Sequence, residues 1–555
     1  MTSSNERLLR PGSPFELIAA TSSGSSPRFR HAPASLNGLY RKAVGSTSRV
    51  CMHFAGRDIT YGEILTEANA VAYRLTRNHG ISIGDRVALI LPTSPQWLVA
   101  FIAVTSIGAV AVLIHQQDPP SRTLSALAQT RCLAVIADEA TGRMLAAHAD
   151  CRPRILVRIS SGETPVTSGE GTFDGIAPTE GQPRFDTQAI DPECEALIAF
   201  TTGSTSPPKA VISSHRAVIS GVMNMMLSSA LASVRNRLQG AATPRVQALP
   251  SSLLLAPLTH VGGYSHLLLM MQVAGKIVPL PSWQVAAGVD LIERQKLRAI
   301  SGANAGQLRE LLRTDSMQGR LGSLTSIGIH GEALRANILN ELRDRLPDAT
   351  PGTGYGLTET NGAFCAAIGS DLVERPGTCG PIVPSVELRL LDEHGERVPM
   401  GGAGEIWVRG AMLMSGYCAA RENQSGTSSD GWFCTEDFGR IDEHGFLYLV
   451  ERRQDVFFCE GKSLSVSRIE QVVYECEHID EAAGFFTGAG HSVRRVVIAV
   501  VPRKDAQDHE AQVAARVARE LPAEACEVVV ITLPRLPRLP SGKIDRRALR
   551  RHFAA

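Results

Sequence analysis

The chain has 555 residues, more than a single hydrophobic core usually serves, so we expect two or more domains. Hydrophobic residues make up 44% and charged residues 20%, a composition typical of a soluble globular protein. Lysine and arginine number 56 against 55 aspartate and glutamate, and this near-balance argues against a nucleic-acid partner or an anionic membrane surface.

The cysteines and the N-terminus predict a cytoplasmic location. The 11 cysteines are scattered, without a Cys-x-x-Cys pair or a Cys/His cluster at metal-ligand spacing, which favours reduced thiols over a disulfide scaffold or a zinc site. The N-terminal segment MTSSNERLLRPGSPFEL is charged and interrupted by proline, so we expect no secretory signal sequence.

Short apolar runs alternate with helical patterns along the first part of the chain. The runs VALILP, AVAVLI and LAVIA predict strands, while 95–107 and 122–130 predict helices, an alternation typical of βαβ units in parallel sheets. The uncharged stretch from Trp97 to Ile114 reaches the length of a membrane span. Because Ser94-Pro95 has the form of a helix start and Gly108 separates helix from strand, we predict a buried strand–helix–strand unit and no span.

The run TTGSTSPPKA, Thr201 to Ala210, follows the apolar strand ALIAF after a polar connection at 161–186. Backbone N–H groups, several hydroxyls and one lysine are suited to a polyphosphate. The run is not a Walker loop, because Pro208 and Ala210 stand where that motif needs glycine and serine or threonine. It therefore predicts a phosphate loop of another type.

Around residue 450 the pattern changes from glycine-rich turns and short strands, such as GEIWVRG and GFLYLV, to a compact α+β pattern. Helices near 467–475 and 507–520 alternate there with the strands VVIAVV and EVVVIT. We predict a large N-terminal domain over 1–453 and a C-terminal domain over 454–555, close to the commonest domain size.

Six motifs, in this order, resemble those of the adenylate-forming superfamily, which includes acyl-CoA and aryl-CoA synthetases, peptide-synthetase adenylation domains and beetle luciferases. The resemblance covers nearly the whole chain, and the ordered set is more specific than any single motif. The motifs are TTGSTSPPKA (201–210), PLTHVGG (257–263), GYGLTET (354–360), TEDFGRID (435–442), ERRQD (451–455) and SGKIDR (541–546).

The resemblance implies an α/β fold with two parts. The large N-terminal domain would have parallel and mixed sheets with flanking helices and a β-subdomain, and the C-terminal domain would be a small, mobile α+β lid. It also implies an enzyme that uses ATP and Mg²⁺ to join a carboxylic acid to AMP, and then transfers the acyl group to coenzyme A.

For ATP, the resemblance implies binding residues in several parts of the large domain. Glu359 would hold Mg²⁺, a hard cation that prefers carboxylate and phosphate oxygens, and Thr358 would donate to the α-phosphate. Tyr355 would stack on the adenine, Asp437 would accept from the ribose hydroxyls, and its neighbour Glu436 is expected to be a solvated charge. The remaining ATP-binding candidates are Thr201, Thr202, Gly203, Ser204, Thr205, Lys209, Gly331, Glu332, Ala333 and Arg452.

For catalysis, the resemblance points to Lys543 in SGKIDR, together with Thr358, Glu359 and His260. A lysine bridging the carboxylate and the α-phosphate would lower the barrier between two anions. The C-terminal domain would then rotate about Gln454, where the family usually has aspartate or lysine. Gly461 matches a glycine that lets the thiol arm of coenzyme A pass.

The acid is expected to be bulky or long and apolar. The segment PLTHVGGYSHLLL carries no carboxylate for a substrate ammonium, and an unpaired buried ammonium is costly, which argues against an amino acid. His260 would line the acyl pocket and orient the carboxylate. The other acyl-pocket candidates are Gly262, Gly263, Asn304, Gly306 and His330.

The acceptor stays open between coenzyme A and a carrier protein or an amine. Fatty-acyl-AMP ligases that serve carrier proteins carry an insertion after the TET motif, and the distance from Thr360 to Pro376 leaves no room for one, which favours coenzyme A. Two other classes are a phosphotransferase or ATPase, which would release ADP, and a non-catalytic acyl-nucleotide sensor, which would not need Lys543. A homodimer is also left open.

Overall fold

We describe the chain from a computed structural model, with two compact units defined by their internal contacts. One unit holds most of the chain up to Phe433, and the other holds 202–208, 388–408 and the part from Cys434 onward. The boundary predicted at 453/454 stays a prediction, because 453–455 lie outside the described residues. The structure describes residues 7–19, 26–148, 155–159, 189–201, 208–238, 249–314, 319–329, 336–392, 394–418, 426–452, 456–459, 462–476, 478–487, 495–503, 509–519, 521, 527–538 and 544–553.

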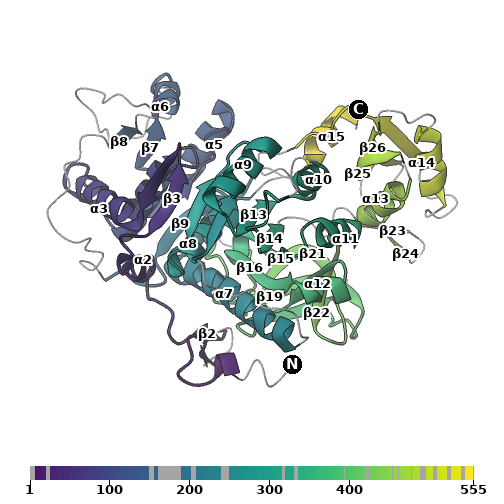
Figure 1. Cartoon of the computed structure of the whole chain (residues 1–555), viewed down its shortest axis with the longest axis horizontal. Helices are drawn as coiled ribbons and strands as arrows, with labels where there is room; N and C mark the ends of the chain where they lie inside the picture. The colour runs from purple at the N-terminus through teal and green to yellow at the C-terminus, as the bar shows by residue number, and fades with distance from the viewer. Residues whose placement is uncertain are drawn as a thin grey trace. The chain divides into compact units, whose positions relative to one another are not determined.

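The first unit contains a seven-stranded sheet in the order β20-β10-β9-β6-β5-β7-β8. Its central strands are parallel, and β10 and β20 add an antiparallel edge. Strands β7, β8 and β9 of this sheet are labelled in Figure 1. The strands are β5 (Arg86–Ile90), β6 (Val110–Leu113), β7 (Ala134–Asp138), β8 (Ile155–Ile159), β9 (Glu195–Phe200), β10 (Ala210–Ser214) and β20 (Gly416–Tyr417).

The expected strand–helix–strand unit is confirmed between β5 and β6. Helix α4 (Pro95–Ser106) starts at the Ser94 N-cap with Pro95 in its first turn, and β6 follows after Gly108. Every residue from Trp97 to Thr105 is buried, so the uncharged stretch belongs to the core. The other helices associated with this part of the chain are α2 (Leu36–Val44), α3 (Tyr61–Arg77), α5 (Pro120–Thr130) and α6 (Glu139–Ala146).

A second, eight-stranded sheet in the same unit has the order β16-β15-β14-β13-β11-β12-β3-β4. Its central pairs are parallel and its two edge pairs, β15 with β16 and β3 with β4, are antiparallel. The strands are β3 (Val50–Phe54), β4 (Arg57–Thr60), β11 (Ser251–Leu254), β12 (Lys276–Pro279), β13 (Ala299–Ala303), β14 (Ser326–Ile329), β15 (Thr350–Leu357) and β16 (Gly362–Ile368).

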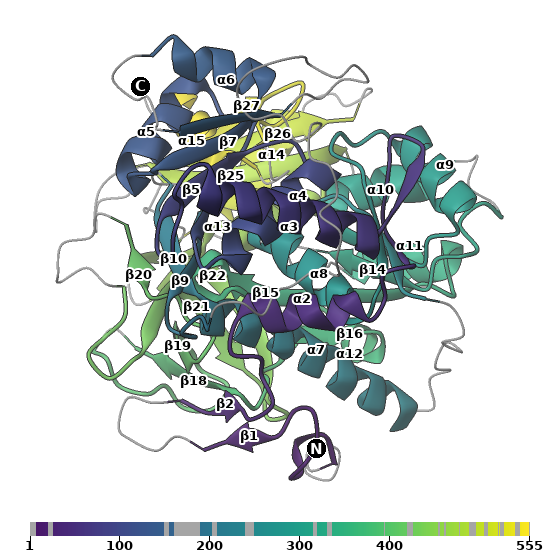
Figure 2. The ribbon, with the colours of Figure 1, turned by 90° about the vertical axis from the view of Figure 1, so that its left-hand side faces the viewer.

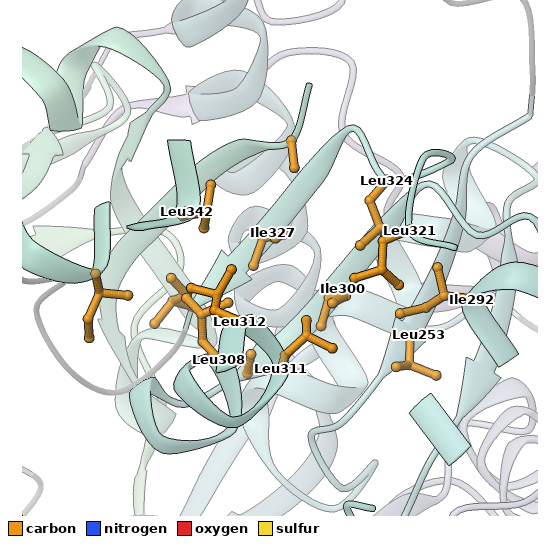
Figure 3. Packing of buried hydrophobic residues seen from close by; sticks show 14 of the residues in the cluster. Leu253, Ile292, Ile300, Leu308, Leu311, Leu312, Leu321, Leu324, Ile327 and Leu342 are labelled. Carbon is orange, nitrogen blue, oxygen red and sulfur yellow. The ribbon is translucent and has the colours of Figure 1, made fainter. Parts of the chain in front are cut away.

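Helices pack on this sheet through leucine and isoleucine side chains. Leu253, Ile300 and Ile327 project from adjacent parallel strands, and Ile292 and Leu308 meet them from two helices (Figure 3). Strand side chains buried under helices are typical of a parallel sheet. The helices are α8 (Val261–Gln272), α9 (Val285–Gln295), α10 (Ala305–Arg313), α11 (Ala336–Arg345) and α12 (Ser370–Glu374).

Helix α7 (His215–Leu238) has 24 residues and runs beside β16. Among the described residues it alone is long and apolar enough, by length and composition, to cross a membrane, with a mean hydropathy of 1.6. However, 67% of that stretch is buried inside the protein, as in the core helix of a globular unit.

The second unit is built on two small sheets. Strands β22, β21, β19 and β18 lie side by side in one, and β25, β26 and β27 form the other. The strands are β18 (Val386–Leu391), β19 (Ala403–Gly410), β21 (Phe433–Ile441), β22 (Phe446–Arg452), β25 (Ile479–Thr487), β26 (Arg495–Pro502) and β27 (Glu527–Thr532). The remaining strands are β1 (Leu17–Ile18), β2 (Arg28–Phe29), β17 (Thr378–Pro381), β23 (Val456–Cys459) and β24 (Lys462–Ser465).

The α+β pattern predicted after residue 450 is confirmed. Helices α13 (Val466–Tyr474), α14 (His509–Ala518) and α15 (Arg546–Phe553) accompany the three-stranded sheet. Along β26, Val496, Ile498 and Val500 belong to one core cluster and Val497 and Ala499 to another, so both faces of the strand are covered.

Candidate active site

Two antiparallel strands of the first unit, β9 and β10, flank the predicted phosphate loop in the chain. Its ends are closed by two hydrogen bonds: Thr201 N donates to the Lys209 carbonyl at 3.0 Å, and Lys209 N donates to Oγ1 of Thr201 at 2.9 Å. The Thr201 hydroxyl is therefore used at the base of the loop, while the Lys209 side chain is exposed. The other loop candidates, 202–205, lie outside the described residues.

The TET motif forms a one-turn 3₁₀ helix, η4 (Thr358–Thr360), between β15 and β16. Oγ1 of Thr360 accepts from Leu357 N at 2.8 Å and donates to the Gly362 carbonyl at 2.8 Å. The Thr358 and Glu359 side chains are 7% and 8% exposed. The two predicted functional residues, Thr358 and Glu359, are thus buried in this turn. The hydrogen bonds of Thr360 hold the turn in place.

Asn361, for which the sequence suggested no role, anchors the end of this turn. It is fully buried, has a φ of +53°, and its amide Nδ2 donates to the Met412 carbonyl at 3.0 Å. Its Oδ1 accepts from the Tyr264 hydroxyl of α8 at 3.4 Å. Gly221 of α7 permits the close approach, because a Cβ there would meet the Asn361 carbonyl oxygen at 2.3 Å. The sequence did contain a sign of this role: an asparagine directly follows TET, and asparagine tolerates the positive φ that ends such a turn.

A segment that sequence reasoning missed links η4 to the phosphate loop; we call 412–418 the strap. Met414 N donates to the Glu359 carbonyl, Ser415 N to the Ile212 carbonyl and Cys418 N to the Ala210 carbonyl, each at 2.8 Å. Strand β20, within the strap, pairs with β10 (Figure 2). The uncharged run AMLMSGY was a sign of burial, but only the fold reveals what the segment joins.

Tyr417 of the strap contacts both predicted charged groups. Its hydroxyl donates to Oε1 of Glu359 at 2.9 Å. Nζ of Lys209 lies 5.2 Å from the centre of its ring, within the range of a cation–π contact. The structure therefore brings together the phosphate-loop lysine and the predicted metal-binding carboxylate through one tyrosine.

Tyr355, the predicted adenine-stacking residue, lies on β15 and is 5% exposed. Its ring packs edge-to-face against Phe364 of β16, with centroids 5.2 Å apart and an interplanar angle of 71°. This contact fixes the ring orientation. Stacking on adenine stays a prediction.

His260 caps the N-terminus of α8. Its Nδ1 accepts from Gly262 N at 3.1 Å, so the neutral ring carries its proton on Nε2 and can donate from there. At Gly263 a Cβ would meet the Pro257 carbonyl oxygen at 2.0 Å, which gives this glycine a packing reason independent of substrate. The acyl-pocket roles predicted for His260, Gly262 and Gly263 stay predictions.

Asn304 caps α10 through a capping box. Its Oδ1 accepts from Gln307 N at 2.9 Å, and Oε1 of Gln307 accepts from Asn304 N at 3.0 Å. Gly306 lies in the first turn of the same helix. The amide oxygen of Asn304 therefore has a structural use, and its place in the acyl pocket stays a prediction; His330 and 331–333 lie outside the described residues.

In the second unit, Asp437 on β21 pairs in register with Arg452 on β22. Asp437 is 6% exposed, and its N–H donates to Oγ1 of Thr435 at 3.2 Å. The neighbouring Glu436 is exposed, which confirms that expectation. The antiparallel register thus brings the two predicted ribose-binding residues to one place on this sheet.

The C-terminal candidates Lys543, Gln454 and Gly461 lie outside the described residues. On either side of 539–543 the chain is held: Asp545 N donates to the Pro537 carbonyl at 2.8 Å, and Oδ1 of Asp545 accepts from Ala548 N at 2.9 Å. The second of these bonds caps the start of α15. In the sequence, the predicted catalytic lysine lies three positions before Arg546, the first residue of this capped helix.

Burial shifts the pKa of two titratable groups near these elements. The pKa of Tyr264 is raised, mainly by burial and also by the charge of Glu359. Burial lowers the pKa of His215, the first residue of α7, from 6.5 to about 4. Nδ1 of His215 accepts from Leu36 N at 3.3 Å. Because an accepting Nδ1 carries no proton, this hydrogen bond favours the neutral ring.

These elements define a class of protein. The family model described as "AMP-binding enzyme" matches residues 39–418, and the chain belongs to this family of adenylate-forming ligases, as its motifs indicated. The predicted fold class, α/β with two domains, is confirmed by the solved structures that the chain resembles.

Among curated proteins the chain is similar to 4-coumarate–CoA ligase 5 of Oryza sativa subsp. japonica, with 25% identity over 552 residues that cover 93% of this chain and 94% of that protein. Among solved structures it is similar to the amide bond synthetase McbA from Marinactinospora thermotolerans, with a TM-score of 0.79, 25% identity and coverage of 94% and 100%. The anthranilate CoA ligase AuaEII in complex with anthranoyl-AMP has the same fold, with a TM-score of 0.77, 22% identity and coverage of 94% and 97%.

Proposed function

We propose that this adenylate-forming ligase is an acyl-CoA synthetase acting on a bulky or long apolar carboxylic acid. In the first step a carboxylate oxygen attacks the α-phosphorus of ATP, forming acyl-AMP and expelling pyrophosphate. In the second step the sulfur of coenzyme A attacks the acyl carbonyl carbon, AMP leaves, and the thiol proton passes to solvent. The net result is a thioester, AMP and pyrophosphate.

The observation that carries this proposal is the cluster of Lys209, Tyr417 and Glu359 at the phosphate loop. A cation and a carboxylate held by one side chain suit a magnesium-bound polyphosphate. Similarity to 4-coumarate–CoA ligases over about nine-tenths of the chain supports both the acid substrate and the thiol acceptor.

The donor chemistry of the cluster fits Mg²⁺. Among the residues that the structure describes, no group of three or more histidine, cysteine or acidic side chains could hold a metal by itself. Mg²⁺ commonly uses one or two carboxylates and completes its shell with water and substrate phosphates, which matches a single buried Glu359. The ion would offset the charge of the phosphates, while Thr358 donates to the α-phosphate.

Lys543 is the group proposed for the chemistry of the first step. Two anions must meet when the carboxylate approaches the α-phosphate, so an ammonium between them lowers the barrier electrostatically. In this proposal the domain 454–555 brings Lys543 to the nucleotide and then rotates about Gln454, so that the thiol arm of coenzyme A passes Gly461. Asp437 and Arg452 would hold the ribose.

His260 is proposed to orient the acid. Because its Nδ1 accepts from Gly262 N, the ring can donate only from Nε2 when neutral, and a substrate carboxylate is a fitting acceptor. The segment after His260 holds no acidic side chain between Val261 and Gln272, which disfavours a substrate with an ammonium group.

The alternative is an acyl-AMP ligase that passes the acyl group to an amine or a carrier protein. The structural similarity to an amide bond synthetase, at a TM-score of 0.79, favours the amine within this alternative. Both acceptors would leave the adenylation step and its residues unchanged. Only the nucleophile of the second step differs.

A panel of carboxylic acids, assayed for AMP and pyrophosphate with and without coenzyme A, tests the proposal. It should include aromatic acids such as 4-coumarate, long-chain acids and amino acids as controls. We expect pyrophosphate with apolar acids, faster AMP release with coenzyme A, and a thioester detectable by mass spectrometry. Amide formation with added amines and no thioester would favour the alternative, and ADP in place of AMP would contradict both.

A further inference from the structure

Glu359 is held by the strap through both its backbone and its side chain. Its carbonyl accepts from Met414 N at 2.8 Å, and its Oε1 accepts from the Tyr417 hydroxyl at 2.9 Å. Glu359 is 8% exposed, so this hydrogen bond operates largely out of water. A charge-assisted hydrogen bond in such surroundings strongly restricts the orientation of a carboxylate.

The position of Tyr417 is itself set by β10, which pairs with β9 in the antiparallel hairpin that flanks the phosphate loop. Ser415 N and Cys418 N, on either side of it, donate to the Ile212 and Ala210 carbonyls of β10, each at 2.8 Å. In the register of β20 and β10, Tyr417 lies opposite Val211, two residues after Lys209. The tyrosine is therefore fixed to β10, the strand that directly follows the loop lysine, and its hydroxyl contacts Glu359.

We propose that Tyr417 is a positioning residue that orients the Glu359 carboxylate for a phosphate-bound Mg²⁺ and the Lys209 ammonium for the same phosphates. The inference rests on the roles proposed above for Glu359 and Lys209. The hydroxyl uses a lone pair of Oε1 and so sets the direction of the carboxylate. The ring face attracts the ammonium and keeps it beside the loop before ATP arrives.

The chain offers a matched control in Tyr448 of the second unit. The Tyr448 hydroxyl donates to Oδ2 of Asp442 at 3.2 Å, and the guanidinium carbon of Arg440 lies 4.0 Å from its ring centre. It therefore makes the same two kinds of contact, to a carboxylate and to a cation, and has no role in the proposed site. Tyr448→Phe measures the general effect of losing such a hydroxyl.

The test measures ATP binding to the full chain by isothermal titration calorimetry, with and without Mg²⁺, for the wild type and for Tyr417→Phe, Tyr417→Leu and Tyr448→Phe. We expect Tyr417→Phe to reduce the Mg²⁺-linked gain in ATP affinity about tenfold, the order of one charge-assisted hydrogen bond, and to leave metal-free ATP binding unchanged. Tyr417→Leu should also weaken metal-free binding about threefold, because Lys209 loses its ring contact. Tyr448→Phe should change neither quantity.

Glu359→Gln completes a double-mutant cycle. This variant should lose the Mg²⁺-linked gain, and Tyr417→Phe added to it should have no further effect on that gain if the two residues act together. Thermal unfolding checks that each variant is folded. A Tyr417→Phe variant with the wild-type gain, or a wild type that gains nothing from Mg²⁺, overturns the inference. If the wild type releases no AMP with any acid, the proposed function fails separately.

Discussion

The η4 turn and the three-stranded sheet β25–β27 are held together by different kinds of interaction. Around η4 the contacts are polar, because hydroxyl and amide groups of Thr360, Asn361 and Tyr417 bond to backbone carbonyls and to Glu359. The sheet is held by apolar side chains on both faces, such as Val496 and Val497.

This difference determines whether a substitution in each region changes stability and activity together or only one of them. At η4 the groups proposed for chemistry are also part of the network that shapes the turn, so a substitution there affects both. In the C-terminal unit the proposed catalytic Lys543 precedes a helix whose core residue Leu549 packs on the sheet. A substitution of Lys543 should therefore lower activity with little effect on stability, and a substitution of Leu549 should lower stability with little effect on activity.

The largest expected effect is that of Lys543→Ala. Removing a group that stabilises the transition state electrostatically typically costs about 3–4 kcal/mol, so we expect pyrophosphate exchange to fall about a hundredfold to a thousandfold. ATP affinity and the unfolding temperature should stay close to those of the wild type. Arg547→Ala, at an exposed position of α15, is the matched control and should change neither. Near-normal exchange in Lys543→Ala would remove the lysine from the mechanism.

The second expected effect is on stability, through Leu549→Ala. Leu549 is 1% exposed and packs with Phe485 and Leu536, so its truncation should lower the free energy of unfolding of this unit by about 3 kcal/mol. Differential scanning calorimetry would detect an earlier transition. Adenylation measured well below that transition should be changed much less than by Lys543→Ala. If the activity of Leu549→Ala fell as far as that of Lys543→Ala without any earlier unfolding, the proposed separation of a stability role from a catalytic role would be wrong.

The third effect is a pH dependence located in the first unit. Burial lowers the pKa of His215 to about 4 in the folded chain, against 6.5 for the exposed group, so the unfolded state takes up the proton first. The contribution of neutral His215 to the free energy of unfolding is fully present above about pH 6.5. It falls by about 3 kcal/mol in total as the pH is lowered toward 4.

Denaturant unfolding between pH 7.5 and 4.5 measures this slope, with His215→Asn as the comparison. Asparagine keeps an acceptor that can take the place of Nδ1 for Leu36 N but does not titrate, so the variant should lose less stability over this range. The same slope in both proteins would mean that other groups cause the acid sensitivity.

The local elements could be predicted because the evidence for them is itself local. Ser94-Pro95 predicted the start of α4, Gly108 its separation from β6, and the alternation after residue 450 predicted the elements of the C-terminal unit. The site was predicted less completely. The GYGLTET motif named Thr358 and Glu359, while Tyr417 and Asn361 carry their meaning only through partners distant in the chain.

Several residues also have structural uses that their motifs did not suggest. Asn304 caps α10, His260 caps α8, and Gly263 is needed for the approach of the Pro257 turn. Backbone hydrogen bonding at a helix start and steric contact between chain segments decide these uses. Neither quantity can be read from residue type alone.

By itself, the sequence determined the alternating elements, the order of the motifs and the family, because periodicity, capping residues and turn residues act over a few positions. The tertiary structure decided that the strap at 412–418 lies between β10 and η4, and that one tyrosine contacts both Lys209 and Glu359. The physical reason is that these contacts join residues 55 (Glu359 to Met414) and more positions apart, and their geometry exists only after both sheets have formed.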